Sequence, residues 1–197
     1  MYSIVIMSGL TDKDLAMLNM GSYDQPHYHA SAVGKGWIVD DELTTPESTV
    51  YHNPISKHSV IAFRGTAEKK DLRTDALLFL NIGGKSNRYK ESNMLADRVI
   101  SKYGQQNTSL TGHSLGADIA SNVSKNKNLE AVSFSKGRKL LPSKNAPRER
   151  VIRAVGDPFS GTAVIPSAFS LPNLLIGGSG RIPNLSKGTP HSLQQFI

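Results

Sequence analysis

The sequence predicts an α/β fold in which a mostly parallel central sheet is flanked by helices. The first observation is that β-rich runs alternate with helical runs along most of the chain, an order typical of parallel sheets. The second is a GxSxG pattern, Gly112 to Gly116, placed where a β-rich run passes into a helical one. Such a turn strains the backbone of its central residue, and the flanking glycines let neighbouring chain approach. Ser114 is therefore expected to project from a sharp turn, beside the first N–H groups of the helix.

Local signals define the elements in chain order. Thr11 and Asp14 have the spacing of a capping box and Gly21 is a stop signal, so a helix is expected over residues 11–20. An amphipathic pattern followed by a glycine predicts a second helix over residues 90–103. Strands are expected at residues 37–40, 49–52, 59–63, 107–111, 130–135 and 151–155, a short helix or ordered loop at residues 70–80, and an end near Ser124 for the helix that begins at Ser114.

Length and composition predict one globular domain over residues 1–197. The chain is 38% hydrophobic and 20% charged, which is ordinary for a soluble protein. No apolar run approaches the roughly 20 residues that a transmembrane helix needs, and the first residues lack the basic start of a signal peptide. There is no cysteine, hence no disulfide and no thiol nucleophile, which favours an intracellular protein. A cytoplasmic location is expected rather than classical secretion.

Residues 121–153 carry the whole positive excess of a chain whose formal net charge is +7. This segment holds nine basic and two acidic residues, and the rest of the chain holds 14 of each. A solvated basic face explains the excess as well as attraction to an anionic membrane surface or to nucleic acid does. Phe134 is the one aromatic residue of the segment, which argues against single-stranded nucleic acid. Nucleic acid is therefore the least favoured of these partners.

His27 and His29 form a His-x-His pair that could ligate a metal ion. A zinc site needs at least three protein ligands, and no third candidate lies nearby in the sequence. The pair is better explained as part of a surface loop, and no metal site is expected.

Ser114 becomes a nucleophile only with help from other residues. A serine hydroxyl attacks poorly at neutral pH, so an imidazole has to accept its proton during attack on an acyl carbon and later return it to the leaving alcohol. The order serine, acid, histidine expected of an α/β-hydrolase is met by Asp157, at the end of a predicted strand, and His191. Asp157 would hold the imidazole in the right tautomer. The plainer alternatives are a turn-forming Asp157 before Pro158 and a surface His191 in a C-terminal tail.

Acyl transfer also needs N–H donors for the developing oxyanion, each commonly worth about 3 kcal/mol. The N–H of Leu115 follows the serine directly. A second donor is expected from the turn after an earlier strand, where Gly65 permits the turn and Thr66 offers an N–H and a hydroxyl. His113 adjoins Ser114, but neighbours in a tight turn point apart, so His113 is expected to pack rather than to act as the base.

Taken together, these blocks resemble the class 3 (fungal-type) lipases, a family of α/β-hydrolases. The resemblance covers residues 37–197 and rests on VIAFRGT at residues 60–66, TGHSLGA at residues 111–117, GDP at residues 156–158 and HSL at residues 191–193. It implies an α/β-hydrolase that acts on acylglycerols and related lipid esters, without a cofactor. The residues that it implies are Ser114, Asp157 and His191 as the catalytic triad, Thr66 and Leu115 as the oxyanion hole, Asp75 as a support of Thr66, and residues 67–82 as a lid.

The expected function is thus a serine hydrolase of the triacylglycerol lipase, phospholipase or carboxylesterase type. Small cysteine-free relatives of this kind also occur in viruses and phages, which adds a virion-associated protein to the expected settings. Two alternatives remain. A catalytically silent lipase-like module would bind lipid or an assembly partner and would not react with a fluorophosphonate probe. A basic nucleic-acid binder would show a steep salt dependence of DNA or RNA binding.

Overall fold

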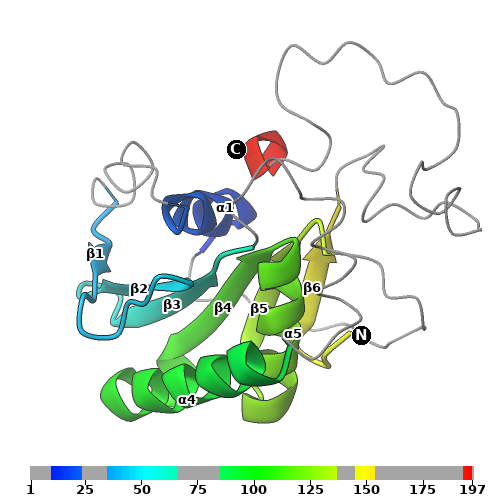
Figure 1. Cartoon of the computed structure of the whole chain (residues 1–197). Coiled ribbons are helices and arrows are strands. Elements are labelled where there is room, and N and C mark those ends of the chain that lie inside the picture. The colour runs from blue at the N-terminus through cyan, green and yellow to red at the C-terminus, as the bar shows by residue number, and fades with distance from the viewer. Residues whose placement is uncertain (1–9, 24–34, 66–84, 137–144, 154–192, 197) are drawn as a thin grey trace, which may run out of the picture.

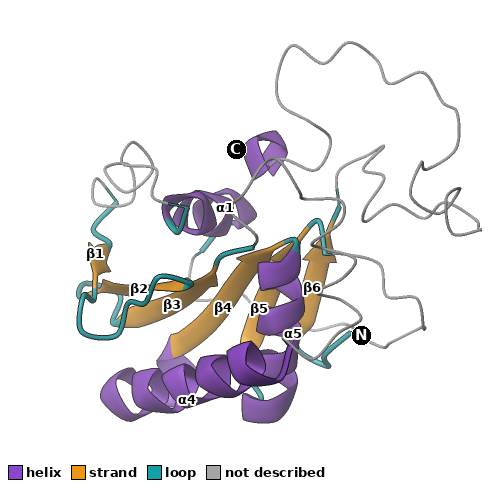
Figure 2. Cartoon of the chain, in the orientation of Figure 1, coloured by secondary structure: helices purple, strands orange, loops and turns teal. Residues whose placement is uncertain are grey.

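The computed structural model describes residues 10–23, 35–65, 85–136, 145–153 and 193–196. Its helices are α1 (Asp12–Gly21), α4 (Lys85–Tyr103) and α5 (Leu115–Lys127), with short 3-10 helices η1 (Gln105–Asn107) and η2 (Leu193–Phe196). Its strands are β1 (Ile38–Val39), β2 (Ser48–Asn53), β3 (His58–Phe63), β4 (Thr108–His113), β5 (Glu130–Phe134) and β6 (Glu149–Ile152). Helices α4 and α5 cover one face of the sheet, and α1 covers the other (Figures 1 and 2).

The six strands lie side by side in their chain order, β1-β2-β3-β4-β5-β6. Strands β1, β2 and β3 pair antiparallel, and β3, β4, β5 and β6 pair parallel. The register pairs Phe63 with Gly112 and His113 with Phe134, so the carboxyl ends of β3, β4 and β5 meet at one edge of the sheet. The predicted mostly parallel α/β sheet is therefore confirmed, and its first three strands form an antiparallel extension.

Side chains alternate between two hydrophobic cores, as the period of two along a strand requires. In β3, Ile61 and Phe63 pack with α4 and α5, whereas Val60 and Ala62 pack with α1. All four side chains are fully buried. Because both faces of the sheet are covered, its edge at the carboxyl ends of the parallel strands is where polar chemistry can gather.

The capping box predicted for α1 is confirmed by two hydrogen bonds. The backbone N–H of Asp14 donates to Thr11 Oγ1 at 3.1 Å, and the backbone N–H of Thr11 donates to Asp14 Oδ2 at 3.0 Å. Both bonds satisfy N–H groups that a helix start otherwise leaves without an acceptor.

Other predicted boundaries shift by a few residues. Helix α4 starts at Lys85 rather than at residue 90, because side chains of its first turns bond to other elements, as described below. Strand β4 runs on to His113 instead of ending at residue 111, and β6 starts at Glu149 instead of at residue 151. Among the helices of the described ranges, none is long and apolar enough to cross a membrane.

Candidate active site

Ser114 sits between the end of β4 and the start of α5, with backbone angles φ 56° and ψ −119°. A positive φ is rare for a residue with a side chain and costs on the order of 1–3 kcal/mol. The turn is held from both sides. The N–H of Ser114 donates to the Phe134 carbonyl at 3.1 Å, and the Ser114 carbonyl accepts from the N–H of Ala117 at 3.1 Å. The strained strand-to-helix turn that the sequence pattern predicts is therefore present.

Gly112 and Gly116 are glycines because backbone passes too close for a side chain. A Cβ on Gly112 would lie 2.2 Å from the Gly116 carbonyl oxygen, and a Cβ on Gly116 would lie 2.1 Å from the Phe63 carbonyl oxygen. The two positions thus bring β4, the start of α5 and the end of β3 into direct backbone contact. These contacts fix where Ser114 lies relative to β3.

The turn after β3 packs against the serine. A Cβ on Gly65 would lie 3.4 Å from Ser114 Cβ and 2.8 Å from the His113 carbonyl oxygen. This closeness follows from the parallel pairing of β3 with β4, which ends both strands at the same level of the sheet. The Arg64–Gly65 turn and the N-terminus of α5, which carries Leu115, therefore flank Ser114.

Side chains from distant parts of the chain hold this turn. Tyr23 Oη accepts the N–H of Gly65 at 2.7 Å, and Arg88 Nη2 donates to the Arg64 carbonyl at 2.7 Å. Asn19 Nδ2 donates to the carbonyl of Phe63 at 3.0 Å. The sequence offered no signal for these three residues, because they contact the turn across 42, 24 and 44 positions of the chain.

His113 is buried at the end of β4 and faces Tyr23. The Tyr23 hydroxyl lies 3.2 Å from His113 Nδ1, and the two rings meet edge to face with centroids 6.2 Å apart. Burial raises the pKa of Tyr23 to about 12, so its hydroxyl keeps its proton at neutral pH. The expected packing role of His113 fits this arrangement.

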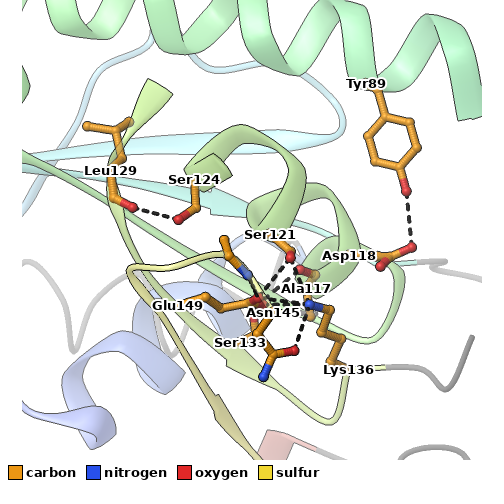
Figure 3. Close-up of polar contacts among 11 residues, drawn as sticks. Tyr89, Ala117, Asp118, Ser121, Ser124, Leu129, Ser133, Lys136, Asn145 and Glu149 are labelled. Atoms are coloured by element: carbon orange, nitrogen blue, oxygen red, sulfur yellow. Dashed lines mark hydrogen bonds and ion pairs between the residues drawn. The ribbon is translucent and has the colours of Figure 1, made fainter. Parts of the chain in front are cut away.

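A polar cluster joins α5 to β5 and β6 (Figure 3). Lys136 Nζ forms a 2.8 Å ion pair with Glu149, and 5% and 0% of these two side chains are exposed. Ser121 and Ser133 each donate a hydrogen bond to the same carboxylate. Burial works against the charged form of Glu149, but the bonds from Lys136, Ser133 and Ser121 outweigh it and lower its pKa. Because the carboxylate is fully buried and surrounded by donors, we assign the cluster a structural role.

A further hydrogen bond, partly buried, joins the two helices on this face. Tyr89 of α4 donates its hydroxyl to Asp118 Oδ2 of α5 at 3.0 Å (Figure 3). Asp118 is 2% exposed. The burial of Tyr89 and the nearby charge of Asp118 raise the pKa of Tyr89. Asp118 lies one turn along the helix from Ser114 and anchors α4 against α5.

Several predicted site residues lie outside the described ranges. Of the predicted set, the structure brings Ser114, Leu115, Gly112 and Gly116 together, beside Gly65. In the described parts of the chain, no group of three or more His, Cys, Asp or Glu side chains could hold a metal ion. The predictions that fall outside are Thr66, Asp75, Asp157 and His191, the lid at residues 67–82, and the pair His27 and His29.

Ion pairs neutralise part of the basic segment at residues 121–153. Lys127 pairs with Asp97 at 2.6 Å and Arg148 with Glu130 at 2.8 Å. Arg150 pairs with Asp12, and Lys136 is in the buried cluster. The described part of the segment is therefore less positive toward solvent than its composition indicates.

Comparison with known proteins identifies a family model that matches the chain. A family model described as phospholipase-like, Tle-like phospholipase domain, matches residues 14–154. No curated protein matches the chain. Among solved structures, the Lip2 lipase from Yarrowia lipolytica is similar at 19% identity with a TM-score of 0.32, over 46% of this chain and 41% of that one. The chain thus aligns with less than half the length of that lipase.

Proposed function

The chain belongs to the family of Tle-like phospholipase domains, and on that basis we propose that it is a serine hydrolase of lipid carboxylic esters. The observation that carries the proposal is the strained backbone of Ser114 at the start of α5, with the turn after β3 against it. A serine held in this way presents its hydroxyl beside the unbonded N–H groups of a helix start, where negative charge is favoured. That setting suits attack on an ester and the oxyanion that results.

In the proposed mechanism, Ser114 Oγ attacks the acyl carbon while His191 takes its proton. The carbonyl oxygen becomes an oxyanion, which accepts hydrogen bonds from the N–H groups of Leu115 and Thr66. His191, oriented by Asp157, then gives the proton to the leaving alcohol, and an acyl-enzyme remains. Water then attacks the acyl-enzyme as His191 accepts its proton, and His191 gives that proton to Ser114 Oγ as the bond to the acyl group breaks and the fatty acid leaves.

The proposed substrates are acylglycerols or phospholipids, without a cofactor. Residues 67–82 are proposed as a lid over the acyl pocket and Asp75 as a support of Thr66. A preference for anionic lipid surfaces is also proposed. The basic residues of 121–153 other than Lys127, Lys136, Arg148 and Arg150 would contact the anionic lipid, because these four are in ion pairs. Equal hydrolysis rates on phosphatidylcholine and phosphatidylglycerol vesicles at low salt would count against the preference.

Covalent labelling by a fluorophosphonate tests the mechanism. The wild type should label, and Ser114→Ala, Asp157→Asn and His191→Ala should lose most or all labelling. Ser101→Ala is the matched control, because Ser101 is an exposed serine of α4, and it should label like the wild type. An unlabelled wild type that binds lipid vesicles would support the silent module instead, and equal labelling of Ser114→Ala would refute the assignment of the nucleophile.

A further inference from the structure

We infer that Tyr23 and Arg88 are positioning residues that hold the Arg64–Gly65 turn against Ser114, an inference that rests on the proposed function. Neither residue belongs to the sequence blocks that carry the chemistry. Each side chain forms a hydrogen bond with the backbone of the same two-residue turn.

The Tyr23 hydroxyl bridges the two strand ends that flank the serine. Its oxygen accepts the N–H of Gly65 at 2.7 Å, after β3, and the hydroxyl lies 3.2 Å from Nδ1 of His113, the last residue of β4. The hydroxyl oxygen accepts from Gly65, and which partner donates in the bond between the hydroxyl and His113 Nδ1 follows from the tautomer of His113. One hydroxyl therefore links the turn to the residue that precedes Ser114.

This bridge also decides which backbone donor the turn can offer to substrate. The N–H of Gly65 points to Tyr23 Oη and is occupied, so it is not free for an oxyanion. The second donor of the proposed mechanism is therefore assigned to the next residue of the chain, Thr66, rather than to Gly65. Loss of the Tyr23 hydroxyl would release the Gly65 N–H and let the turn shift.

Arg88 holds the other side of the same turn. Its Nη2 donates to the Arg64 carbonyl at 2.7 Å, and its Nε donates to Glu47 Oε2 at 2.6 Å. The backbone of the turn is also tied to Glu47, whose carbonyl accepts the N–H of Arg64 at 3.0 Å. Tyr23 follows α1 and Arg88 belongs to α4, which cover opposite faces of the sheet (Figure 1), so the turn is held between the two layers.

Tight packing makes the position of the turn matter. A Cβ on Gly65 would lie 2.8 Å from the His113 carbonyl oxygen and 2.6 Å from Tyr23 Oη, so Gly65 packs closely against the residue that precedes Ser114. In the proposed mechanism, a shift of Gly65 would also move the oxyanion donor assigned to the next residue. A misplacement of about 1 Å in such a site commonly costs about 100-fold in rate, and loss of an oxyanion donor costs about 100- to 1000-fold in kcat.

The test compares Tyr23→Phe with Tyr103→Phe on a short-chain p-nitrophenyl ester. Tyr103 is the matched control, because its hydroxyl also makes a side-chain hydrogen bond, to Asp40 Oδ2 at 2.6 Å, but near the opposite ends of the strands. Tyr23→Phe should lower kcat by about 10- to 100-fold and change KM by less than about 2-fold, whereas Tyr103→Phe should keep kcat within about 2-fold. Arg88→Lys, which retains the charge but not the two-pronged contact, should also lower kcat selectively.

Hydrogen exchange of the Gly65 amide separates failure of this inference from failure of the proposed function. Exchange at Gly65 should speed up at least about 10-fold in Tyr23→Phe and not in Tyr103→Phe, whether or not the wild type hydrolyses esters. An inactive, unlabelled wild type with this exchange pattern would overturn the hydrolase and keep the turn assignment. An active wild type in which Tyr23→Phe and Tyr103→Phe have the same kcat would overturn the positioning role, and unchanged Gly65 exchange would overturn the bridge itself.

Discussion

Replacing Glu149 by leucine removes the acid of the buried ion pair beneath α5. The variant leaves the Lys136 ammonium, 5% exposed, without its carboxylate, and the backbone N–H of Ala146 loses its acceptor at 3.1 Å. Breaking a buried pair by removing one partner costs about 3–5 kcal/mol, since the remaining charge stays buried and uncompensated. In a chain of this size that loss corresponds to a fall of roughly 6–20 °C in Tm.

Urea unfolding followed by circular dichroism at neutral pH measures the loss, and the double variant Lys136→Met with Glu149→Leu tests its cause. If the uncompensated charge dominates, the double variant should recover at least half of the lost free energy of unfolding. Glu130→Gln is the control, because it breaks the Arg148–Glu130 pair, whose side chains are 43% and 19% exposed, and should cost less than about 1 kcal/mol. A double variant as unstable as the sum of the two single variants would refute this reasoning.

Three further predictions concern the backbone around Ser114 and the pH dependence of stability. Gly116→Ala should lower the free energy of unfolding by about 1–3 kcal/mol, because its Cβ would meet the Phe63 carbonyl; an unchanged urea midpoint would contradict the packing. Ser114→Gly should raise the free energy of unfolding by about 1 kcal/mol, because glycine relieves the positive φ, and should abolish fluorophosphonate labelling. A destabilised variant would argue against strain at this position. Burial lowers the pKa of His58 below 6.5 in the folded protein. As the pH falls below about 6.5, His58 is therefore protonated in the unfolded chain before it is protonated in the folded one, and the free energy of unfolding should decrease. His58→Asn should reduce that pH dependence, which urea titrations at several pH values can measure.

Short-range patterns determined the local backbone of this protein. The capping box of α1 joins Thr11 to Asp14, and the GxSxG pattern spans Gly112 to Gly116, so both patterns are short stretches of sequence. The turn at Ser114 is held in addition by the backbone of Phe63 and Phe134. Runs of β-favouring residues likewise predicted the strands, because strand propensity belongs to the residues of one strand. The α/β class followed from the order of these elements.

The boundary of α4 was harder to predict, because tertiary contacts contribute to its first turns. The composition near residue 85 gives no strong start signal, yet Arg88 bonds to Glu47 and Arg64, and Tyr89 bonds to Asp118. These contacts favour the helical conformation of residues that local propensity leaves undecided.

Sequence by itself therefore predicted the α/β class, the approximate positions of the strands and helices, and the strained turn at Ser114. The tertiary structure decided the order of the strands and which side chains surround that turn. Lys136 counted as one more basic residue of a positive segment, yet it is paired and buried with Glu149. Tyr23 and Arg88 carried no pattern, and they reach the Arg64–Gly65 turn across 42 and 24 positions of the chain. A local pattern fixes backbone angles because the groups that set them are neighbours in the chain, whereas contacts between distant residues exist only after the two faces of the sheet have been packed.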